Sequence, residues 1–279
     1  MTTSDTTERR TRTDRRGKTA PAIAAELRAG LERGEIEILF QPQFAATDNR
    51  LVGAEALARC QHPDQVTIGG AMLFEIAERA DLVEALTHRI VRDALEIAGN
   101  WPVPLRLSLN VTAADVAGGT FADNIAGAVA EARFPPEHLT LEITEQVLLA
   151  DLDRTAAQLR RLADLGIRIA LDDFGAGFCN FEYLKRLPLH ALKLDRGMIQ
   201  GIVGEPRDLA VLRGILAMAR ALGLEVVAEG VEDEAQRLAI AREGCASWQG
   251  FLGAKPMTAL ELAALMQQLG TAEERMDHS

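Results

Sequence analysis

Eight short apolar segments recur along the chain, and most of them are separated by segments in which apolar residues return every three or four positions. The first pattern is typical of buried strands and the second of amphipathic helices. The expected strands are 36–44, 51–60, 105–111, 139–145, 167–174, 191–195, 225–231 and 247–252. Eight strands that alternate with helices favour an α/β barrel. An open, doubly wound sheet is the alternative.

One connection departs from this alternation. Only six residues, 45–50, join the first two expected strands, and this is close to hairpin length. We therefore expect these two strands to pair antiparallel. A helix is expected before them, over 21–33.

The composition excludes several classes of protein. The chain has 279 residues, a formal net charge of −11, 48% hydrophobic and 25% charged residues, which is ordinary for a globular protein. An acidic chain is a poor non-specific binder of nucleic acid polymers. It has no run of about 18 apolar residues, the length of a membrane span, and its polar N-terminus lacks a secretory signal. Cys60, Cys179 and Cys245 form no Cys-x-x-Cys pair, which favours reduced thiols in the cytoplasm.

The two ends differ from the rest of the chain. Residues 1–20 hold six basic and three acidic residues without apolar periodicity, which predicts a disordered basic tail. Residues 271–279 also lack a pattern and are expected to form a disordered C-terminal tail. The folded domain is therefore predicted over 21–270.

Polar side chains stand near the C-terminal side of seven of the expected strands. They are Glu55, Asn110, Glu142 and Glu145, Asp172 and Asp173, Lys193 and Asp195, Glu229 and Glu232, and Gln249. A single acid in an apolar strand is best explained as a structural ion pair, because buried charges are normally paired. Seven strands with the same feature are different, since the C-terminal ends of barrel strands meet at one mouth where active sites form.

Carboxylates crowded at such a mouth repel one another unless cations neutralise them. Oxygen ligands without His or Cys favour Mg²⁺ or Mn²⁺, and the five histidines show no spacing typical of a zinc site. Such ions suit phosphodiester hydrolysis, because they acidify water and offset phosphate charge. Enolases and aldolases also place acids and lysines at a barrel mouth, so this pattern leaves the reaction open. Phosphate-binding Gly-rich loops are absent from the sequence.

The motifs, taken in order, resemble the EAL-domain family of bacterial cyclic-di-GMP phosphodiesterases. The resemblance covers roughly residues 22–268, and the motifs are FQPQ (40–43), GAEALAR (53–59), LNVT (109–112), LEITE (141–145), LDDFGAG (171–177), YLKRLP (183–188), LKLDR (192–196), VVAEGVE (226–232) and QGFL (249–252). Each string is weak alone, but their shared order and spacing are specific. The implied fold is a TIM-like (β/α)8 barrel with one antiparallel strand, which agrees with the short hairpin above.

The resemblance also implies a reaction and a set of roles. The reaction is the hydrolysis of one phosphodiester bond of cyclic-di-GMP to linear pGpG with Mg²⁺ or Mn²⁺, and two ions are expected. The implied metal ligands are Glu55, Asn110, Glu142, Asp172 and Asp173. Lys193 would hold or deprotonate the attacking water with help from Glu229, and Gln249 would order the site. The implied substrate contacts are Gln41, Arg59, Asp195 and Gln249, and Glu145 would brace the loop after the strand 167–174.

The adjacent pair Asp172 and Asp173 also favours two neighbouring ions, since a carboxylate can bridge them. The same resemblance implies cyclic-di-GMP as the ligand, a homodimer, a cytoplasmic location and a role in bacterial signalling, with an unknown regulatory protein as a further partner. Because the segment before Pro21 is short, a stand-alone EAL domain is expected.

The chain departs from the family pattern at a few positions. Phe178, Cys179 and Asn180 stand where the family loop usually reads Tyr-Ser-Ser, and Asp115 stands where a Gln is common. These changes keep a second hypothesis open, in which the domain binds cyclic-di-GMP as a receptor or interaction module and cleaves it slowly or not at all. The retained acids and Lys193 favour the enzyme.

Overall fold

The computed structural model describes residues 20–61, 67–117, 119–144, 151–176 and 181–276. Its strands are β1 (Ile36–Ala45), β2 (Leu51–Gln61), β3 (Thr67–Gly69), β4 (Arg106–Val111), β5 (Leu139–Ile143), β6 (Arg168–Phe174), β7 (Ala191–Leu194), β8 (Glu225–Ala228) and β9 (Ser247–Trp248). Its helices are α1 (Ala20–Arg33), α2 (Gly70–Arg79), α3 (Val83–Gly99), α4 (Ala113–Ala117), α5 (Phe121–Ala132), the 3₁₀ turn η1 (Pro136–His138), α7 (Leu152–Asp164), α8 (Phe181–Arg186), α9 (Arg196–Gln200), α10 (Pro206–Ala221), α11 (Glu234–Glu243) and α12 (Ala259–Met276).

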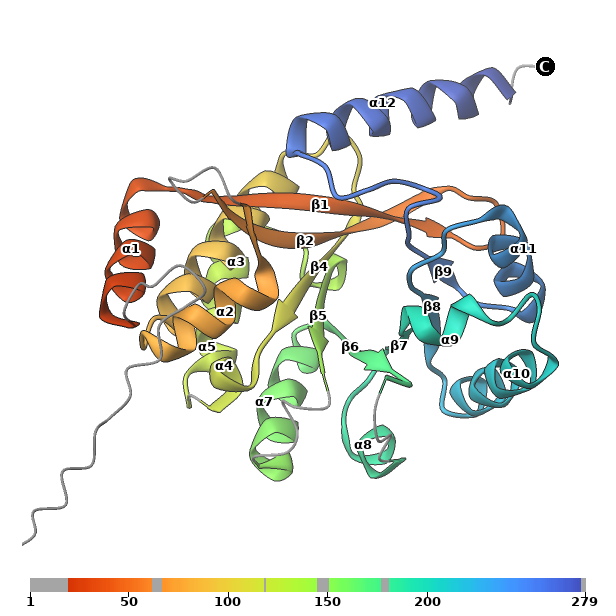
Figure 1. Cartoon of the computed structure of the whole chain (residues 1–279), viewed down its shortest axis with the longest axis horizontal. Coiled ribbons are helices and arrows are strands. Elements are labelled where there is room, and N and C mark those ends of the chain that lie inside the picture. Colours follow the sequence, from red (N-terminus) through yellow and green to blue (C-terminus); the bar gives the residue numbers. More distant parts are fainter. Residues whose placement is uncertain (1–19, 62–66, 118, 145–150, 177–180, 277–279) are drawn as a thin grey trace, which may run out of the picture.

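Eight strands close into a ring, with helices around it (Figure 1). The strand order is β1-β9-β8-β7-β6-β5-β4-β2, and β1 pairs with β2 to complete the circle. The ring pairs from β2 through β9 are parallel, whereas β1 is antiparallel to both of its neighbours. The predicted barrel with one antiparallel strand is therefore confirmed, and the open doubly wound sheet is excluded.

The hairpin between β1 and β2 forms at the predicted place. Gln41 stands opposite Glu55 in its register, and the pairing shifts between Gln43 and Phe44. The turn uses Asn49 with a φ of 59°, a left-handed conformation that Asn tolerates better than most residues. The short strand β3, which the sequence analysis did not predict, pairs with β2 outside the ring.

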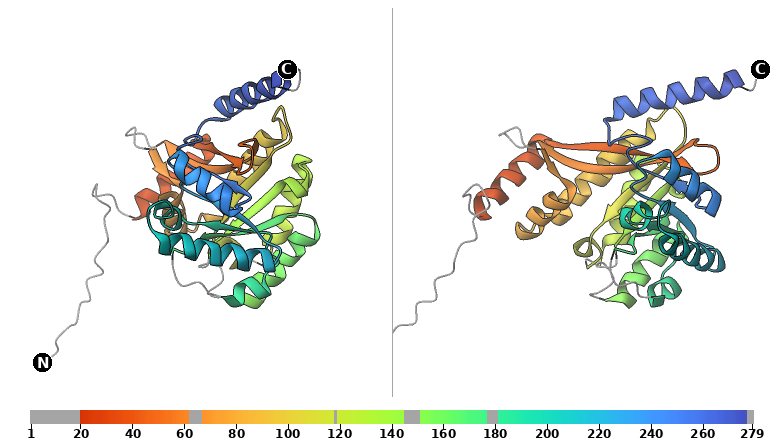
Figure 2. Two further views of the ribbon diagram at one scale, coloured as in Figure 1. Left: turned by 90° about the vertical axis from the view of Figure 1, so that its right-hand side faces the viewer. Right: turned by 45° about the vertical axis from the view of Figure 1, so that its right-hand side comes forward.

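The core explains why the strands read as continuous apolar runs. Every residue of β5 and β7 is buried, because one face packs in the barrel interior and the other lies under the helices. Leu107, Leu139 and Leu159 are among the largest fully buried side chains. The helices thus cover the outer face of a packed barrel, as Figure 2 shows from two further directions.

Helix α12 lies at the C-terminal end of the described residues. It ends at Met276, so it includes residues 271–276, which the sequence analysis assigned to a disordered tail. The expected tail is shorter by that part of the helix. Residues 1–19 of the predicted basic tail lie outside the described residues.

Candidate active site

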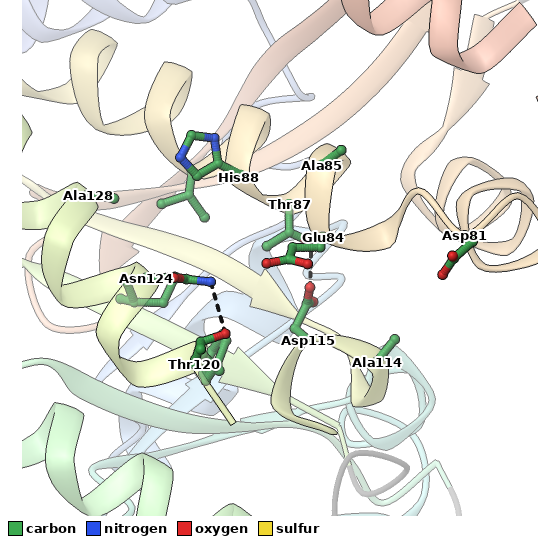
Figure 3. A pocket seen from close by; sticks show the side chains of 13 residues that line it. Asp81, Glu84, Ala85, Thr87, His88, Ala114, Asp115, Thr120, Asn124 and Ala128 are labelled. Carbon is green, nitrogen blue, oxygen red and sulfur yellow. Dashed lines mark hydrogen bonds between the residues drawn. The ribbon is translucent and has the colours of Figure 1, made fainter. Parts of the chain in front are cut away.

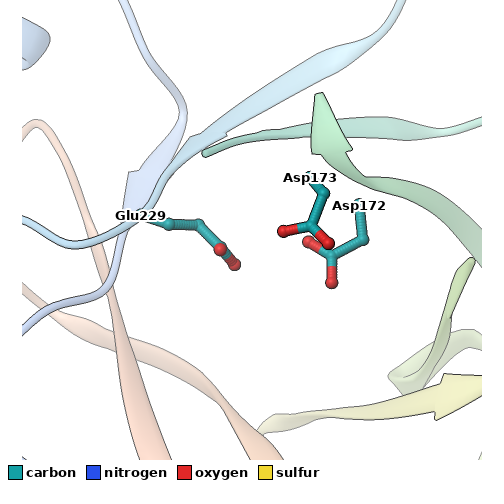
Figure 4. Close-up of side chains that lie close together, drawn as sticks. All are labelled: Asp172, Asp173 and Glu229. Atoms are coloured by element: carbon teal, nitrogen blue, oxygen red, sulfur yellow. The ribbon is translucent and has the colours of Figure 1, made fainter. Parts of the chain in front are cut away.

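The C-terminal ends of the ring strands bring the predicted polar residues to one mouth of the barrel. Parallel strands point the same way, so their ends meet at the same side of the ring. The residues are Glu55 on β2, Asn110 on β4, Glu142 on β5, Asp172 and Asp173 on β6, Lys193 on β7, Glu229 after β8 and Gln249 after β9. Figure 4 shows Asp172 and Asp173 facing Glu229 across this mouth.

Lys193 lies at the centre of the acidic residues and is only 1% exposed. Its Nζ atom is 3.5 Å from Glu55 Oε2, 3.2 Å from Asp172 Oδ1 and 2.8 Å from Glu229 Oε1. It also donates a hydrogen bond to Glu142 Oε2. One buried ammonium group therefore contacts four carboxylates from four different strands or strand ends.

Two amides fix the carboxylate of Glu55. Asn110 Nδ2 donates to Glu55 Oε1 over 2.7 Å, and Gln249 Nε2 donates to Glu55 Oε2 over 2.8 Å. Gln249 Nε2 also donates to Glu229 Oε1 over 3.0 Å. Gln249 can lie here because the next residue, Gly250, lets the backbone pass closely: a Cβ at Gly250 would stand 2.1 Å from a backbone oxygen.

Gln43 is a supporting residue to which the sequence analysis gave no role. Its Nε2 atom donates to Gln249 Oε1 over 3.1 Å, and its side chain is buried. Gln43 lies two residues after Gln41, and residues two apart in a strand share a face. The spacing of two residues in the sequence therefore predicts that both glutamine side chains lie on the same face of β1.

The adjacent carboxylates of Asp172 and Asp173 require an irregular strand. Neighbouring residues in a regular strand point to opposite faces. Asp173 has a φ of 55°, and the pairing of β6 with β7 shifts between Leu171 and Phe174. One oxygen each from Asp172, Asp173 and Glu229 consequently lies within 4.8 Å of the others. A left-handed non-glycine residue is costly and is typical of functional sites.

The crowding of negative charge shifts the pKa values at this mouth. Burial raises the pKa of Glu142 well above its usual range and that of Glu229 to about 8; repulsion from Glu55 and Asp172 adds to both shifts, and Lys193 opposes them. Burial alone would lower the pKa of Lys193, but the surrounding carboxylates raise it well above its usual value. Lys193 is therefore held as an ammonium ion in this arrangement.

The residues at the mouth fit a divalent cation. The mouth holds five carboxylates and the ammonium group of Lys193, and each carboxylate offers oxygen atoms as metal ligands. The carboxylates belong to Glu55, Glu142, Asp172, Asp173 and Glu229. Among the described residues, the buried Asp172 Oδ1 accepts no hydrogen bond of good geometry and has only its ion pair with Lys193. Oxygen-rich sites of this kind suit Mg²⁺ or Mn²⁺.

Three of the predicted substrate residues form hydrogen bonds with the backbone. Gln41 Nε2 donates to the Ala254 carbonyl over 3.4 Å, and Arg59 Nη1 donates to the Ala58 carbonyl over 2.9 Å. Asp195 Oδ1 accepts a hydrogen bond from Gly197 N over 2.8 Å and so caps α9. The role predicted for each of these residues in substrate binding stays a prediction.

Two expectations lie outside the described residues. Glu145, expected to brace the loop after β6, belongs to the segment 145–150, and the altered loop residues belong to 177–180.

Glu232, also noted near a strand end, forms an ion pair with Arg196 over 2.9 Å instead of contacting Lys193. Among the described residues, no helix is both long and apolar enough to span a membrane.

The barrel and its acidic mouth define a (β/α)8 protein with an oxygen-donor site at the C-terminal ends of the strands. Residues 24–256 match the EAL domain family, and the chain belongs to this family. The cyclic di-GMP phosphodiesterase NbdA of Pseudomonas aeruginosa is 38% identical over 251 residues, covering 88% of this chain and 31% of that protein. The cyclic di-GMP phosphodiesterase RocR of the same species is 34% identical over 240 residues, covering 85% of this chain and 61% of that protein.

A solved structure agrees with these relatives. The structure of the PaMucR phosphodiesterase in complex with c-di-GMP matches with a TM-score of 0.80 and 34% identity, covering 86% of this chain and 99% of that one. The chain spans less than two thirds of the length of NbdA and of RocR. The similarity therefore concerns the EAL domain of these larger proteins.

Proposed function

We propose that this chain is a metal-dependent phosphodiesterase that hydrolyses one phosphodiester bond of cyclic-di-GMP and releases linear 5′-pGpG. The observation that carries the proposal is the convergence of four carboxylates on Lys193, with the carboxylate of Asp173 beside two of them. The names of the relatives NbdA and RocR support the same substrate.

The proposed metal site uses the oxygen donors at the mouth. Glu55, Asn110, Glu142, Asp172 and Asp173 would hold Mg²⁺ or Mn²⁺, and two ions are expected. Such ions, when bound, lower the pKa of a coordinated water and offset charge on the attacked phosphate. The side-chain amide of Asn110 already donates its hydrogen to Glu55, which leaves its oxygen available as a ligand.

The water that attacks the phosphate is oriented by Lys193 and Glu229. Lys193 acts as a hydrogen-bond donor, because its neighbours hold it in the protonated form. Glu229 is the proposed proton acceptor, because its carboxylate lies 2.8 Å from Lys193 Nζ. Without metal, burial raises its pKa to about 8, and a bound divalent cation would lower that pKa and keep the carboxylate ionised. The water oxygen bonds to the phosphorus while one of its protons passes to Glu229. The bond from phosphorus to the 3′ oxygen breaks, and this oxygen takes a proton from solvent to become the free 3′ hydroxyl of pGpG.

The substrate anion is recognised by groups at the rim. Arg59, four residues beyond Glu55 on β2, supplies a positive charge for a phosphate, since residues four apart in a strand share a face. Gln41, Asp195 and Gln249 supply hydrogen-bonding groups for the nucleotide. We also propose a homodimer, a cytoplasmic location and a role in lowering this second messenger, and these rest on the sequence resemblance.

A receptor function is the second candidate, and the altered sequence at Phe178, Cys179 and Asn180 favours it. The two functions separate in one experiment. Purified protein is incubated with cyclic-di-GMP and Mg²⁺ or Mn²⁺, with EDTA as the control, and nucleotides are separated by chromatography while binding is measured by calorimetry. The enzyme gives metal-dependent pGpG; a receptor binds cyclic-di-GMP and leaves it intact.

A further inference from the structure

The end of strand β4 is held unevenly on its two sides. Its pairing with β5 continues through Val111 and Ile143, whereas its pairing with β2 ends at Leu109 and Ala56, one residue before Asn110. The chain then turns into α4, a helix of only five residues. So short a helix has few internal hydrogen bonds of its own, and other groups must hold this turn.

Asp115 supplies these contacts. Its Oδ2 atom accepts hydrogen bonds from Thr112 N over 2.8 Å and Thr112 Oγ1 over 2.7 Å, and Thr112 Oγ1 accepts in return from Asp115 N over 3.3 Å. This reciprocal arrangement is a capping box. Thr112 is two residues after Asn110, so the box fixes the backbone that directly follows the strand end.

A third contact connects the capping box to a long helix. Thr87 Oγ1, on the buried face of the 17-residue helix α3, donates to Asp115 Oδ1 over 2.6 Å. Figure 3 shows this hydrogen bond on the wall of a pocket of about 580 Å³ formed by α3, α4 and α5. The pocket lining includes Asp115 and Thr87 and none of the residues that contact Lys193.

We propose that Asp115 is a positioning residue for Asn110, and that the contacts from Thr87 through Asp115 to Thr112 hold Asn110 in place toward Glu55. The inference rests on the proposed function, in which Asn110 is a metal ligand. The common Gln at position 115 of the family has one acceptor oxygen, whereas the Asp carboxylate has two and can accept from Thr112 and Thr87 together.

The chain offers a matched control far along the sequence. At the start of α12, Glu261 Oε2 accepts from Thr258 N over 2.8 Å and Thr258 Oγ1 over 2.9 Å, and Glu261 N donates to Thr258 Oγ1 over 3.3 Å. This is the same capping box at an exposed site. Glu261→Ala and Asp115→Ala therefore each remove one capping box. Only Asp115→Ala also removes a hydrogen bond to α3, and only Asp115 follows the strand end that carries Asn110.

The experiment compares Asp115→Ala, Asp115→Asn and Glu261→Ala with the wild-type chain. Melting temperature is measured without metal and over a Mn²⁺ titration, and kcat and KM for cyclic-di-GMP are measured over the same titration. We expect both alanine variants to lose a few degrees in metal-free melting temperature. Only Asp115→Ala should require about 10–100-fold more Mn²⁺ for half-maximal stabilisation and activity. Asp115→Asn keeps one acceptor oxygen for Thr112 N and loses the other, so its Mn²⁺ requirement should fall between those of wild type and Asp115→Ala.

The outcomes separate the positioning role from the proposed function. An equal Mn²⁺ requirement in Asp115→Ala and Glu261→Ala would overturn the positioning role while leaving the phosphodiesterase intact. If the wild-type chain binds Mn²⁺ without hydrolysis and Asp115→Ala weakens that binding, the proposed function fails and the positioning role stands. If Asp115→Ala does not fold, Thr87→Val replaces it in the comparison, because this variant removes one hydrogen bond and keeps the shape of the side chain. A Mn²⁺ requirement of Thr87→Val equal to that of wild type would then overturn the positioning role of Asp115.

Discussion

Replacing Lys193 with Met is the most informative perturbation of the acidic mouth. Met keeps the length of the buried stem and removes the ammonium group that contacts Glu55, Glu142, Asp172 and Glu229. Removing one partner of a buried ion pair costs roughly 3–5 kcal/mol, because the remaining charge is uncompensated. At roughly 2–4 °C per kcal/mol for a chain of about this size, the metal-free variant should melt about 6–20 °C below wild type at pH 7.5.

The same variant should lose turnover. Lys193 orients the attacking water in the proposed reaction, and such groups contribute roughly 10²–10⁴-fold to the rate. Cyclic-di-GMP binding should persist, because Arg59 and the metal site remain. Mn²⁺ should raise the melting temperature of the variant more than that of wild type, since a cation replaces the missing positive charge.

The assay is differential scanning fluorimetry with and without Mn²⁺, followed by kcat measurement at saturating cyclic-di-GMP. The matched control is Lys185→Met, which removes an exposed lysine from α8 and should change the melting temperature little. A Lys193→Met variant that melts early but keeps its specific activity would show that Lys193 is only a structural ion-pair partner, and would refute the reasoning.

Three further predictions concern the same site. Glu55→Gln should abolish hydrolysis while the circular dichroism spectrum stays unchanged, because an amide cannot accept from both Asn110 and Gln249; near wild-type turnover would contradict the metal assignment. Folding raises the pKa values of Glu142 and Glu229, so the folded state binds their protons more tightly than the unfolded state does. The stability of the metal-free protein should therefore fall as the pH rises from about 4.5 to about 8. A melting temperature that stays constant over this pH range in metal-free buffer would contradict this prediction. Ca²⁺ should inhibit turnover in the presence of Mg²⁺, because it prefers longer bonds and looser coordination; product formation that is unchanged by added Ca²⁺ would argue against the small-ion site.

The barrel was predictable because its strands carry strong local signals. Strands buried on both faces read as continuous apolar runs, and the short connection at 45–50 fixed the antiparallel pair. The predicted strand ends were less accurate. The strand β8 was expected to end at Val231 but ends at Ala228, and Gly230, two residues later, has a φ of 65°. A left-handed glycine ends a strand without changing the apolar pattern around it, so the pattern ran too far.

The convergence of the strand-end residues was predictable, but its geometry was not. The positions of acids near strand ends indicated convergence, which the contacts of Lys193 confirm. The left-handed conformation of Asp173 has no sequence signal, although it brings two adjacent carboxylates to one mouth. The link between Thr87 and Asp115 joins residues 28 positions apart, and such a contact depends on tertiary packing.

The central claim is that water, activated at this mouth, cleaves one bond of cyclic-di-GMP. The most direct measurement is a reaction of the purified chain with cyclic-di-GMP and Mn²⁺ in ¹⁸O-labelled water, with the product analysed by mass spectrometry. The account predicts pGpG that carries a single ¹⁸O atom on its terminal 5′ phosphate, and no such product with EDTA. Cyclic-di-GMP that is bound but recovered intact and unlabelled, with Mn²⁺ present, would contradict the account.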